Sequence, residues 1–122
     1  MIENKSKTAI VSQAVPAAHE LSLWLIPQLD QLPRQRRDGL GARIESCAID
    51  VLEALIEATY SQHKHHILSQ ANRKLELLRH LWRLCYELEA MPQESYEHGT
   101  KLCNELGRQI GGWMKSVRPS IK

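Results

Sequence analysis

The feature that most constrains this fold is the spacing of its apolar side chains, which recur every three or four residues along most of the chain. This spacing matches the turn of an α-helix and differs from the alternation of a half-buried β-strand. The pattern is interrupted at Pro33 with residues 39–41, at residues 61–66 and at residues 90–93. Four segments remain, and each is long enough for a helix of several turns.

The four segments span about residues 8–32, 40–60, 67–89 and 93–117. Short connections between helices of similar length predict an all-α fold, an antiparallel up-down-up-down four-helix bundle. We expect residues 1–122 to form a single domain, because a chain of this length supports one core. Pro16 and Pro27 fall inside the first segment and predict a late start or a kink, since proline lacks a backbone donor.

The third segment has the broadest apolar surface. On a helical wheel its apolar side chains cover about half of the circumference, more than the stripe of a simple surface helix. Such a helix has to be covered from two directions, so we expect it to lie centrally in the bundle or to meet another subunit. The apolar side chains are Leu75, Leu77, Leu78, Leu81, Trp82, Leu84, Cys85 and Leu88.

The fourth segment combines a core stripe that includes Trp113 with two glycines one turn apart, Gly107 and Gly111. Glycine inside a helix costs about 1 kcal/mol relative to alanine. The pair therefore suggests a close backbone approach to another helix or to a partner. The alternative is a helix that is weak at this point.

Composition and cysteine usage indicate a cytoplasmic protein. No stretch approaches the ~18 apolar residues that cross a bilayer, and the polar N-terminus argues against a secretory signal. Cys47, Cys85 and Cys103 are odd in number and have no metal-ligand spacing. We expect buried, reduced thiols, as in a reducing compartment, and no membrane partner.

A catalytic constellation is not evident in the sequence, which has neither a Gly-rich phosphate loop nor a paired-carboxylate pattern. Residues 63–66 contain three histidines around a lysine but have no acidic or Cys partner nearby, so a solvated loop is expected. A metal-dependent enzyme built on this cluster is the alternative. Glu76 is followed three residues later by Arg79, where a di-iron bundle would place histidine. We therefore expect no enzyme activity, no cofactor and no metal.

The basic residues are the remaining signal. The net charge is only +2, but basic residues cluster before and after an acidic second segment. Arg79 and Arg83 lie one turn apart, where two guanidinium groups can bridge phosphates. The alternative is local ion pairing, with Glu76 and Glu87 respectively. The candidate contact residues are Arg34, Arg36, Arg37, Arg73, Arg79, Arg83, Arg108 and Lys115.

Two runs of sequence resemble a known family. Residues 105–116, with the pattern Gly-Arg-x-Ile-Gly-Gly-Trp, look like the C-terminal helix of the accessory variability determinant (Avd) proteins of diversity-generating retroelements. Residues 75–84 resemble the third helix of that family, and residues 25–27, 32–34 and 39–43 resemble the end of its first helix and the following loop. The resemblance covers about residues 20–117. Four-helix proteins encoded in intervening sequences of bacterial large-subunit ribosomal RNA genes share the fold, and the glycine-rich run favours the Avd side.

The resemblance implies a cytoplasmic accessory protein, encoded by a bacterium or phage, that forms a homopentamer. It implies binding to a reverse transcriptase and its template RNA or cDNA without catalysis. The candidate contacts above are then nucleic-acid or polymerase contacts, and the packing candidates within or between subunits are Gly107, Gly111, Trp82 and Trp113. Typical Avd proteins are strongly basic, so at +2 either the charge gathers on one face or polymerase binding dominates. The alternative is an interaction bundle of the ribosomal intervening-sequence type, with no polymerase partner.

Overall fold

Four long helices form the fold, as a computed structural model that describes residues 13–117 shows. They are α2 (Ala14–Leu29), α4 (Ala42–Tyr60), α5 (Lys64–Glu87) and α6 (Gln93–Ser116). A short helix, α3 (Arg34–Arg36), and a π-helical turn, η1 (Arg37–Gly41), lie between α2 and α4. Residues 13–117 contain no strand, so the predicted all-α class is confirmed.

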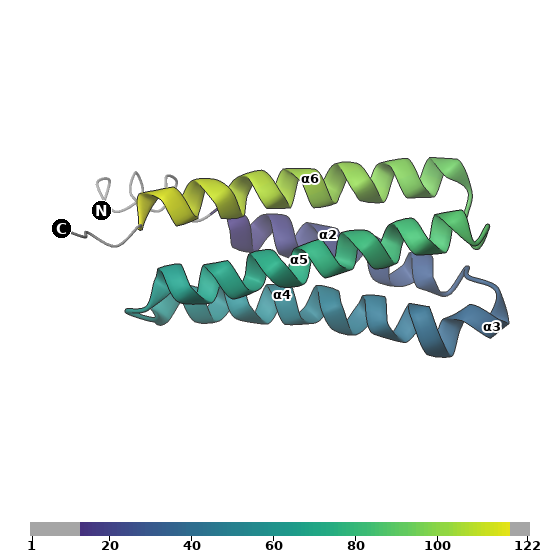
Figure 1. Ribbon diagram of the computed structural model, residues 1–122, viewed down its shortest axis with the longest axis horizontal. Helices are drawn as coiled ribbons and strands as arrows, with labels where there is room; N and C mark the ends of the chain where they lie inside the picture. Colours follow the sequence, from purple (N-terminus) through teal and green to yellow (C-terminus); the bar gives the residue numbers. More distant parts are fainter. Residues whose placement is uncertain (1–12, 118–122) are drawn as a thin grey trace.

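The long helices lie side by side, and their colours show that each long helix runs opposite to the one before it (Figure 1). Helix α5 contacts α4 on one side and α6 on the other, and α2 contacts the same two helices. Polar contacts join α4 to α5, because Lys74 lies 3.4 Å from the Asp50 carboxylate and the Cys47 thiol donates to the Lys74 carbonyl oxygen at 3.3 Å.

The core between the helices is aliphatic, with two buried tryptophans, Trp82 and Trp113. Burial of each large aliphatic side chain contributes roughly 1.5–3 kcal/mol, which is the main term that holds the four helices together. The largest fully buried aliphatic side chains are Leu21, Leu25, Ile44, Val51, Leu55, Leu68, Leu75, Leu78, Leu106 and Ile110.

The expected break at residues 39–41 is wrong, because the chain stays helical from Arg34 to Tyr60 through α3, η1 and α4. The chain changes direction earlier, at Pro33, whose φ of −54° and ψ of 147° are extended. A Cβ at Gly41 would lie 3.3 Å from the Leu32 side chain. That glycine lets a buried leucine approach the backbone, and this packing outweighs the low helix propensity of glycine.

The third helix begins at Lys64, three residues before the predicted start at residue 67. The Lys64 ammonium group donates to the carbonyl oxygens of Ala58, Thr59 and Ser61, at 3.0, 3.2 and 2.8 Å. These carbonyls lie at the C-terminal end of α4, where the last backbone acceptors lack helical partners and a cation is favourable; the Ala58 carbonyl also accepts the Ser61 N–H. Lys64, which was expected in a loop, therefore connects the end of α4 to the start of α5.

Helix α2 begins at Ala14, with Gln13 as its N-cap, and ends at Leu29, three residues before the predicted end. Residues 8–12 of the predicted first segment lie outside the described range. Pro16 occupies the first turn, where backbone N–H groups have no helical acceptor. Pro27 occupies the last turn. The helix therefore accommodates both prolines at its ends. Among the described helices, none combines the length and the apolarity that a membrane crossing needs.

Candidate functional site

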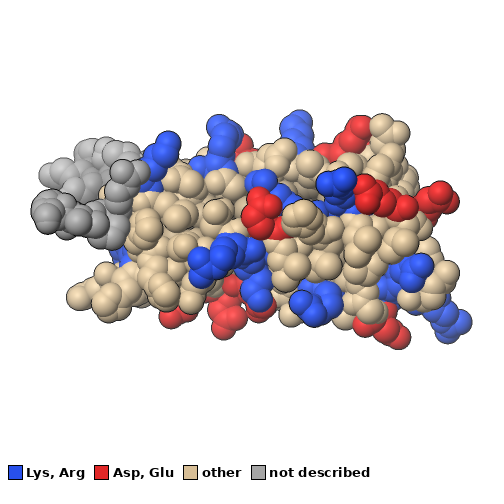
Figure 2. Space-filling view, in the orientation of Figure 1, with Lys and Arg blue, Asp and Glu red and all other residues tan. Residues whose placement is uncertain are grey.

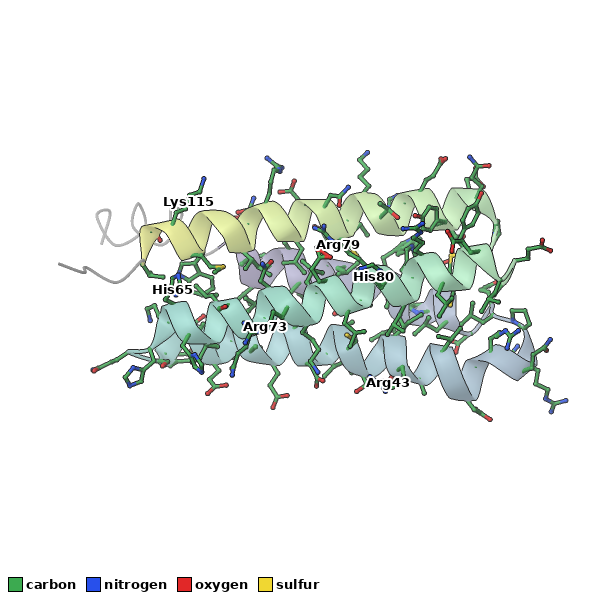
Figure 3. All side chains as sticks on the ribbon, in the orientation of Figure 1. Arg43, His65, Arg73, Arg79, His80 and Lys115 are labelled. Carbon is green, nitrogen blue, oxygen red and sulfur yellow. The ribbon has the colours of Figure 1, made fainter. Side chains whose placement is uncertain are left out.

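A shallow pocket of about 210 Å³ lies between α5 and α6 and contains two of the predicted basic residues. Figure 3 shows Arg79 between these helices and His80 on the neighbouring face of α5. The pocket and its lining are called the α5–α6 groove below. Its residues are Glu76, Arg79, His80, Trp82 and Arg83 from α5 and Tyr96, Thr100 and Cys103 from α6.

Arg79 is held in place by both helices. One Nη donates to the carbonyl oxygen of Cys103 at 3.3 Å, and the other contacts the Glu76 carboxylate at 3.4 Å. The guanidinium occupies the space that a Cβ at Gly107 would fill. The Nε of Arg79 is buried and has no hydrogen-bond partner among residues 13–117. Arg79 therefore connects α5 to α6, and Gly107 is the residue that makes room for it.

Trp82 forms the floor of the α5–α6 groove. Its indole N–H donates to the carbonyl oxygen of Tyr96 at 3.1 Å, and a Cβ at Gly99 would lie only 2.5 Å from the ring. Trp24 contacts the Trp82 ring edge-on, with 5.9 Å between ring centroids. Two glycines of α6 thus receive two large side chains of α5, one aromatic and one cationic.

Arg83 and Tyr96 also line the groove, and Tyr86 lies next to it, stacked on Tyr96. Arg83 Nε lies 2.9 Å from the Glu87 carboxylate, and this hydrogen bond raises the arginine pKa above its usual value. Both partners are exposed, so solvent screens the pair and it contributes little to stability. Tyr86 and Tyr96 stack face to face, with ring centroids 4.4 Å apart and 9° between the planes. Both rings are partly exposed.

The other candidate contact residues lie outside the α5–α6 groove. Lys115 lies on the outer side of α6 (Figure 3), and exposed Arg108 pairs with Glu105 of the same helix. Hydrogen bonds from Gln109 and then Arg108 lower the pKa of Glu105. Arg73 lines a separate pocket beside α4, together with Asp50. The fold therefore does not gather these three basic residues at one point.

The three arginines of the first connection lie at the end of the bundle, in α3 and η1. Arg37 Nε donates to the carbonyl oxygen of Leu32 at 2.9 Å, which ties η1 to the turn that follows α2. Arg34 and Arg36 belong to α3. Figure 2 shows Lys and Arg spread along this face of the molecule, whereas Asp and Glu gather along its lower edge, over α4, and toward the right-hand end.

The residues that form the bundle also match a known protein family. The sequence matches the bAvd-like family over residues 9–117, nearly its whole length. The chain belongs to the bAvd-like family. The predicted resemblance is thereby confirmed, and this family is one of non-catalytic accessory proteins of diversity-generating retroelements. A search of the curated proteins finds no match.

The histidine-rich connection of this bAvd-like chain lines a pocket with Ser69 and Val117. His66 lies 3.3 Å from the Gln70 amide. Between residues 13 and 117, no three His, Cys, Asp or Glu side chains are arranged to hold a metal ion. The predicted alternative of a metal-dependent enzyme therefore gains no support from the geometry of this connection.

The three cysteines are free and buried. Burial raises the pKa of all three thiols, and raises that of Cys103 to about 11 although the nearby Arg79 opposes the shift. A thiol with a raised pKa is protonated at neutral pH and is a poor nucleophile. This agrees with the predicted role of the cysteines as small hydrophobic side chains.

Sequence reasoning missed an apolar stripe on the outer side of α4, named the α4 stripe here: Ile49, Leu52, Ile56 and Tyr60. These residues are three or four positions apart; Ile49, Ile56 and Tyr60 are exposed, whereas Leu52 is half-buried and packs against the edge of the core. Tyr60 is 84% exposed, and Leu23 of α2 is 68% exposed. A helical wheel of the second segment would have revealed the stripe. Glu45, Glu53 and Glu57 belong to the same helix, so the stripe has acidic neighbours.

The two glycines of α6 that were predicted to approach another helix differ. Gly107 packs against Arg79, whereas a Cβ at Gly111 would meet nothing described within 4 Å. We expect Gly111→Ala to stabilise the chain by up to ~1 kcal/mol through helix propensity. Gly107→Ala should gain less, because the methyl group displaces the guanidinium from Cys103. Urea unfolding of both variants measures this difference, with wild type as the reference.

The opposite outcome for Gly111 has a definite meaning. If Gly111→Ala lowers the stability or the oligomer mass while Gly107→Ala does not, the Gly111 backbone is in contact with another subunit. The methyl group would then be excluded by a neighbouring copy. Size-exclusion chromatography with light scattering distinguishes the two cases.

Proposed function

We propose that this bAvd-like chain, folded as an antiparallel up-down-up-down bundle, is a non-catalytic accessory subunit of a diversity-generating retroelement. In this role it binds the reverse transcriptase of the element and its template RNA or cDNA. The family match over residues 9–117 carries the proposal. The α5–α6 groove supports it, because Arg79 and Arg83 are placed together there beside partly exposed aromatic rings.

Two surfaces of different chemistry suit two kinds of partner. The α5–α6 groove combines two arginines, each paired with a glutamate, with aromatic side chains, and arginine N–H groups suit the phosphates of a polyanion. The α4 stripe is apolar, and an apolar centre with a polar rim is typical of protein interfaces. We assign the stripe to contacts with a neighbouring subunit of a homopentamer or with the polymerase.

Assembly would compensate for the low net charge of +2. A ring repeats the groove of each protomer, so a long polyanion makes several modest contacts at once, and their effect multiplies. The binding should then weaken steeply with salt, because each neutralised phosphate releases counterions. The homopentamer has a direct test, since light scattering should give five times the chain mass of 14.0 kDa.

The deciding experiment is co-purification of this chain with the reverse transcriptase encoded by the same retroelement, with and without the template RNA, over increasing NaCl. We expect capture of the polymerase and a further RNA-dependent, salt-sensitive component. The double variant Arg79→Ala, Arg83→Ala should lose the RNA-dependent component. Ile56→Asp with Tyr60→Ser should instead reduce polymerase capture or the oligomer mass.

A clean oligomer that captures neither the polymerase nor the RNA at low salt would contradict the proposal. It would favour the ribosomal intervening-sequence type of bundle. Circular dichroism of each variant is the control, because Arg79 joins α5 to α6 and its removal has to leave the helices formed. Arg83→Gln is the milder companion variant, since Arg83 is exposed and pairs only with Glu87.

A further inference from the structure

We infer that the α5–α6 groove is a subsite for single-stranded nucleic acid, in which an unpaired base lies against Tyr96 and phosphates face Arg79 and Arg83. This inference rests on the proposed function and deepens it, because it names the form of nucleic acid and the place where a base is held. The inferred subsite binds nucleic acid and has no part in binding the reverse transcriptase.

The groove combines cationic and aromatic side chains. Sequence-tolerant binding of single strands uses cationic side chains for the backbone and aromatic rings for the bases. Arg79 and Arg83 line the groove on the α5 side, and Tyr96 and Thr100 line it on the α6 side. Tyr96 already stacks with Tyr86 at a centroid separation of 4.4 Å, so a flat ring can extend an existing stack.

Both arginines keep Nη N–H groups that no described residue uses, although the Nε of Arg79 is buried and does not face the groove. Arg79 uses two of its five N–H groups for Glu76 and Cys103, and this fixes the guanidinium before any ligand arrives. Arg83 is tied only to Glu87, in an exposed pair that a phosphate can replace at little cost. One arginine is thus pre-positioned and the other is free to adjust.

The position of the exposed apolar side chains favours nucleic acid over protein as the partner of the groove. The large apolar side chains that are exposed in residues 13–117 are Leu23, Ile49, Ile56, Tyr60, Leu84 and Leu88, and none of them lines the groove. A protein interface typically has an apolar centre of exposed side chains, and no exposed aliphatic side chain among the described residues lines the groove. The α4 stripe has that character, so the observations assign nucleic acid to the groove.

The small volume of the groove favours an unpaired strand over a duplex. A volume of about 210 Å³ is below the ~300–1,000 Å³ of ordinary ligand pockets, so the groove holds one flat ring or one phosphate of a longer chain. In a duplex the bases are stacked on each other and are not available to aromatic side chains. The groove should therefore prefer a single strand to a duplex of the same length.

The experiment measures fluorescence anisotropy of the full-length protein with three RNA probes of about twelve nucleotides. They are a single strand, the corresponding duplex, and a strand of equal charge in which the bases are replaced by abasic sites. We expect the single strand to bind about ten-fold more tightly than the abasic strand. Tyr96→Leu should remove this difference and leave the salt slope unchanged, because the phosphate contacts remain.

Matched variants keep the result interpretable. Tyr96→Trp retains a stacking ring and should restore the preference for the strand with bases, which a variant that is merely unfolded could not do. Arg83→Gln should reduce the slope of log K against log salt by about one per strand-bound protomer. Lys101→Gln removes the same charge from an exposed position outside the groove, and should change the slope less.

Two outcomes would overturn the inference. Equal affinity for the abasic and the normal strand would show that no base is held. Unchanged binding of the normal strand by Tyr96→Leu would place the bases elsewhere. If the polymerase still co-purifies in either case, the proposed function stands without this subsite, whereas loss of both polymerase and RNA association would reject the function itself.

Discussion

Trp82→Ala is expected to lower the free energy of unfolding by about 3–5 kcal/mol, because it empties a buried site that surrounding helices cannot fill. Trp82 is 1% exposed and belongs to the core from the C-terminal part of α5. Its loss also removes the hydrogen bond to Tyr96 and the edge contact with Trp24. Urea unfolding followed by circular dichroism measures the change, with the midpoint falling at an unchanged slope.

Gly99→Ala tests the same contact from the opposite helix. A methyl group there would lie 2.5 Å from the Trp82 ring, and such overpacking typically costs 1–3 kcal/mol. A double-mutant cycle with Trp82→Phe isolates the contact. The alanine should be better tolerated beside the smaller ring than beside tryptophan, whereas strictly additive effects would show that the two residues do not oppose each other.

Trp113→Ala is the second change with a large expected effect, again about 3–5 kcal/mol, because Trp113 is 3% exposed in the core stripe of α6. Trp113→Phe should behave differently. The indole N–H of Trp113 is buried with no hydrogen-bond partner among residues 13–117, and phenylalanine removes that donor. The smaller ring leaves some space, so we expect a loss below ~1.5 kcal/mol.

The comparison of the two Trp113 variants tells packing from hydrogen bonding. If Trp113→Phe is nearly as destabilising as Trp113→Ala, the N–H has a partner beyond residues 13–117 or in another subunit. Repeating both unfolding curves at several protein concentrations separates these cases. A dependence of the loss on concentration would indicate that Trp113 contributes to assembly.

The two surfaces of the chain give the proposed accessory role a physical basis. Charge on the helices is uneven, since α5 carries Arg73, Lys74, Arg79 and Arg83 whereas α4 is acidic apart from Arg43. The Asp50–Lys74 contact neutralises part of this difference where α4 and α5 meet. Arg79 and Arg83, beside α6, are paired with Glu76 and Glu87, and a polyanion can compete for these partly exposed pairs, whereas the α4 stripe suits a protein partner.

The sequence by itself determined the helices and the family. The spacing of leucines is a local signal, because side chains three and four residues apart share a helix face whatever the rest of the chain does. It therefore predicted the extent of α6 and the burial of Trp113 correctly. The run at residues 105–116 likewise supported the family that the match over residues 9–117 establishes.

Only the tertiary structure decided the rest, because the deciding contacts join residues far apart in the chain. Glycine propensity predicted a break at residues 39–41, but packing of Leu32 against Gly41 keeps that region helical. The sequence shows Arg79 and Arg83 as two similar basic residues one turn apart. In the structure, the Arg79 guanidinium is fixed by its hydrogen bond to the Cys103 carbonyl and occupies the space beside Gly107. Neither partner lies within one helical turn of Arg79, so helix periodicity carries no information about the contact that distinguishes Arg79 from Arg83.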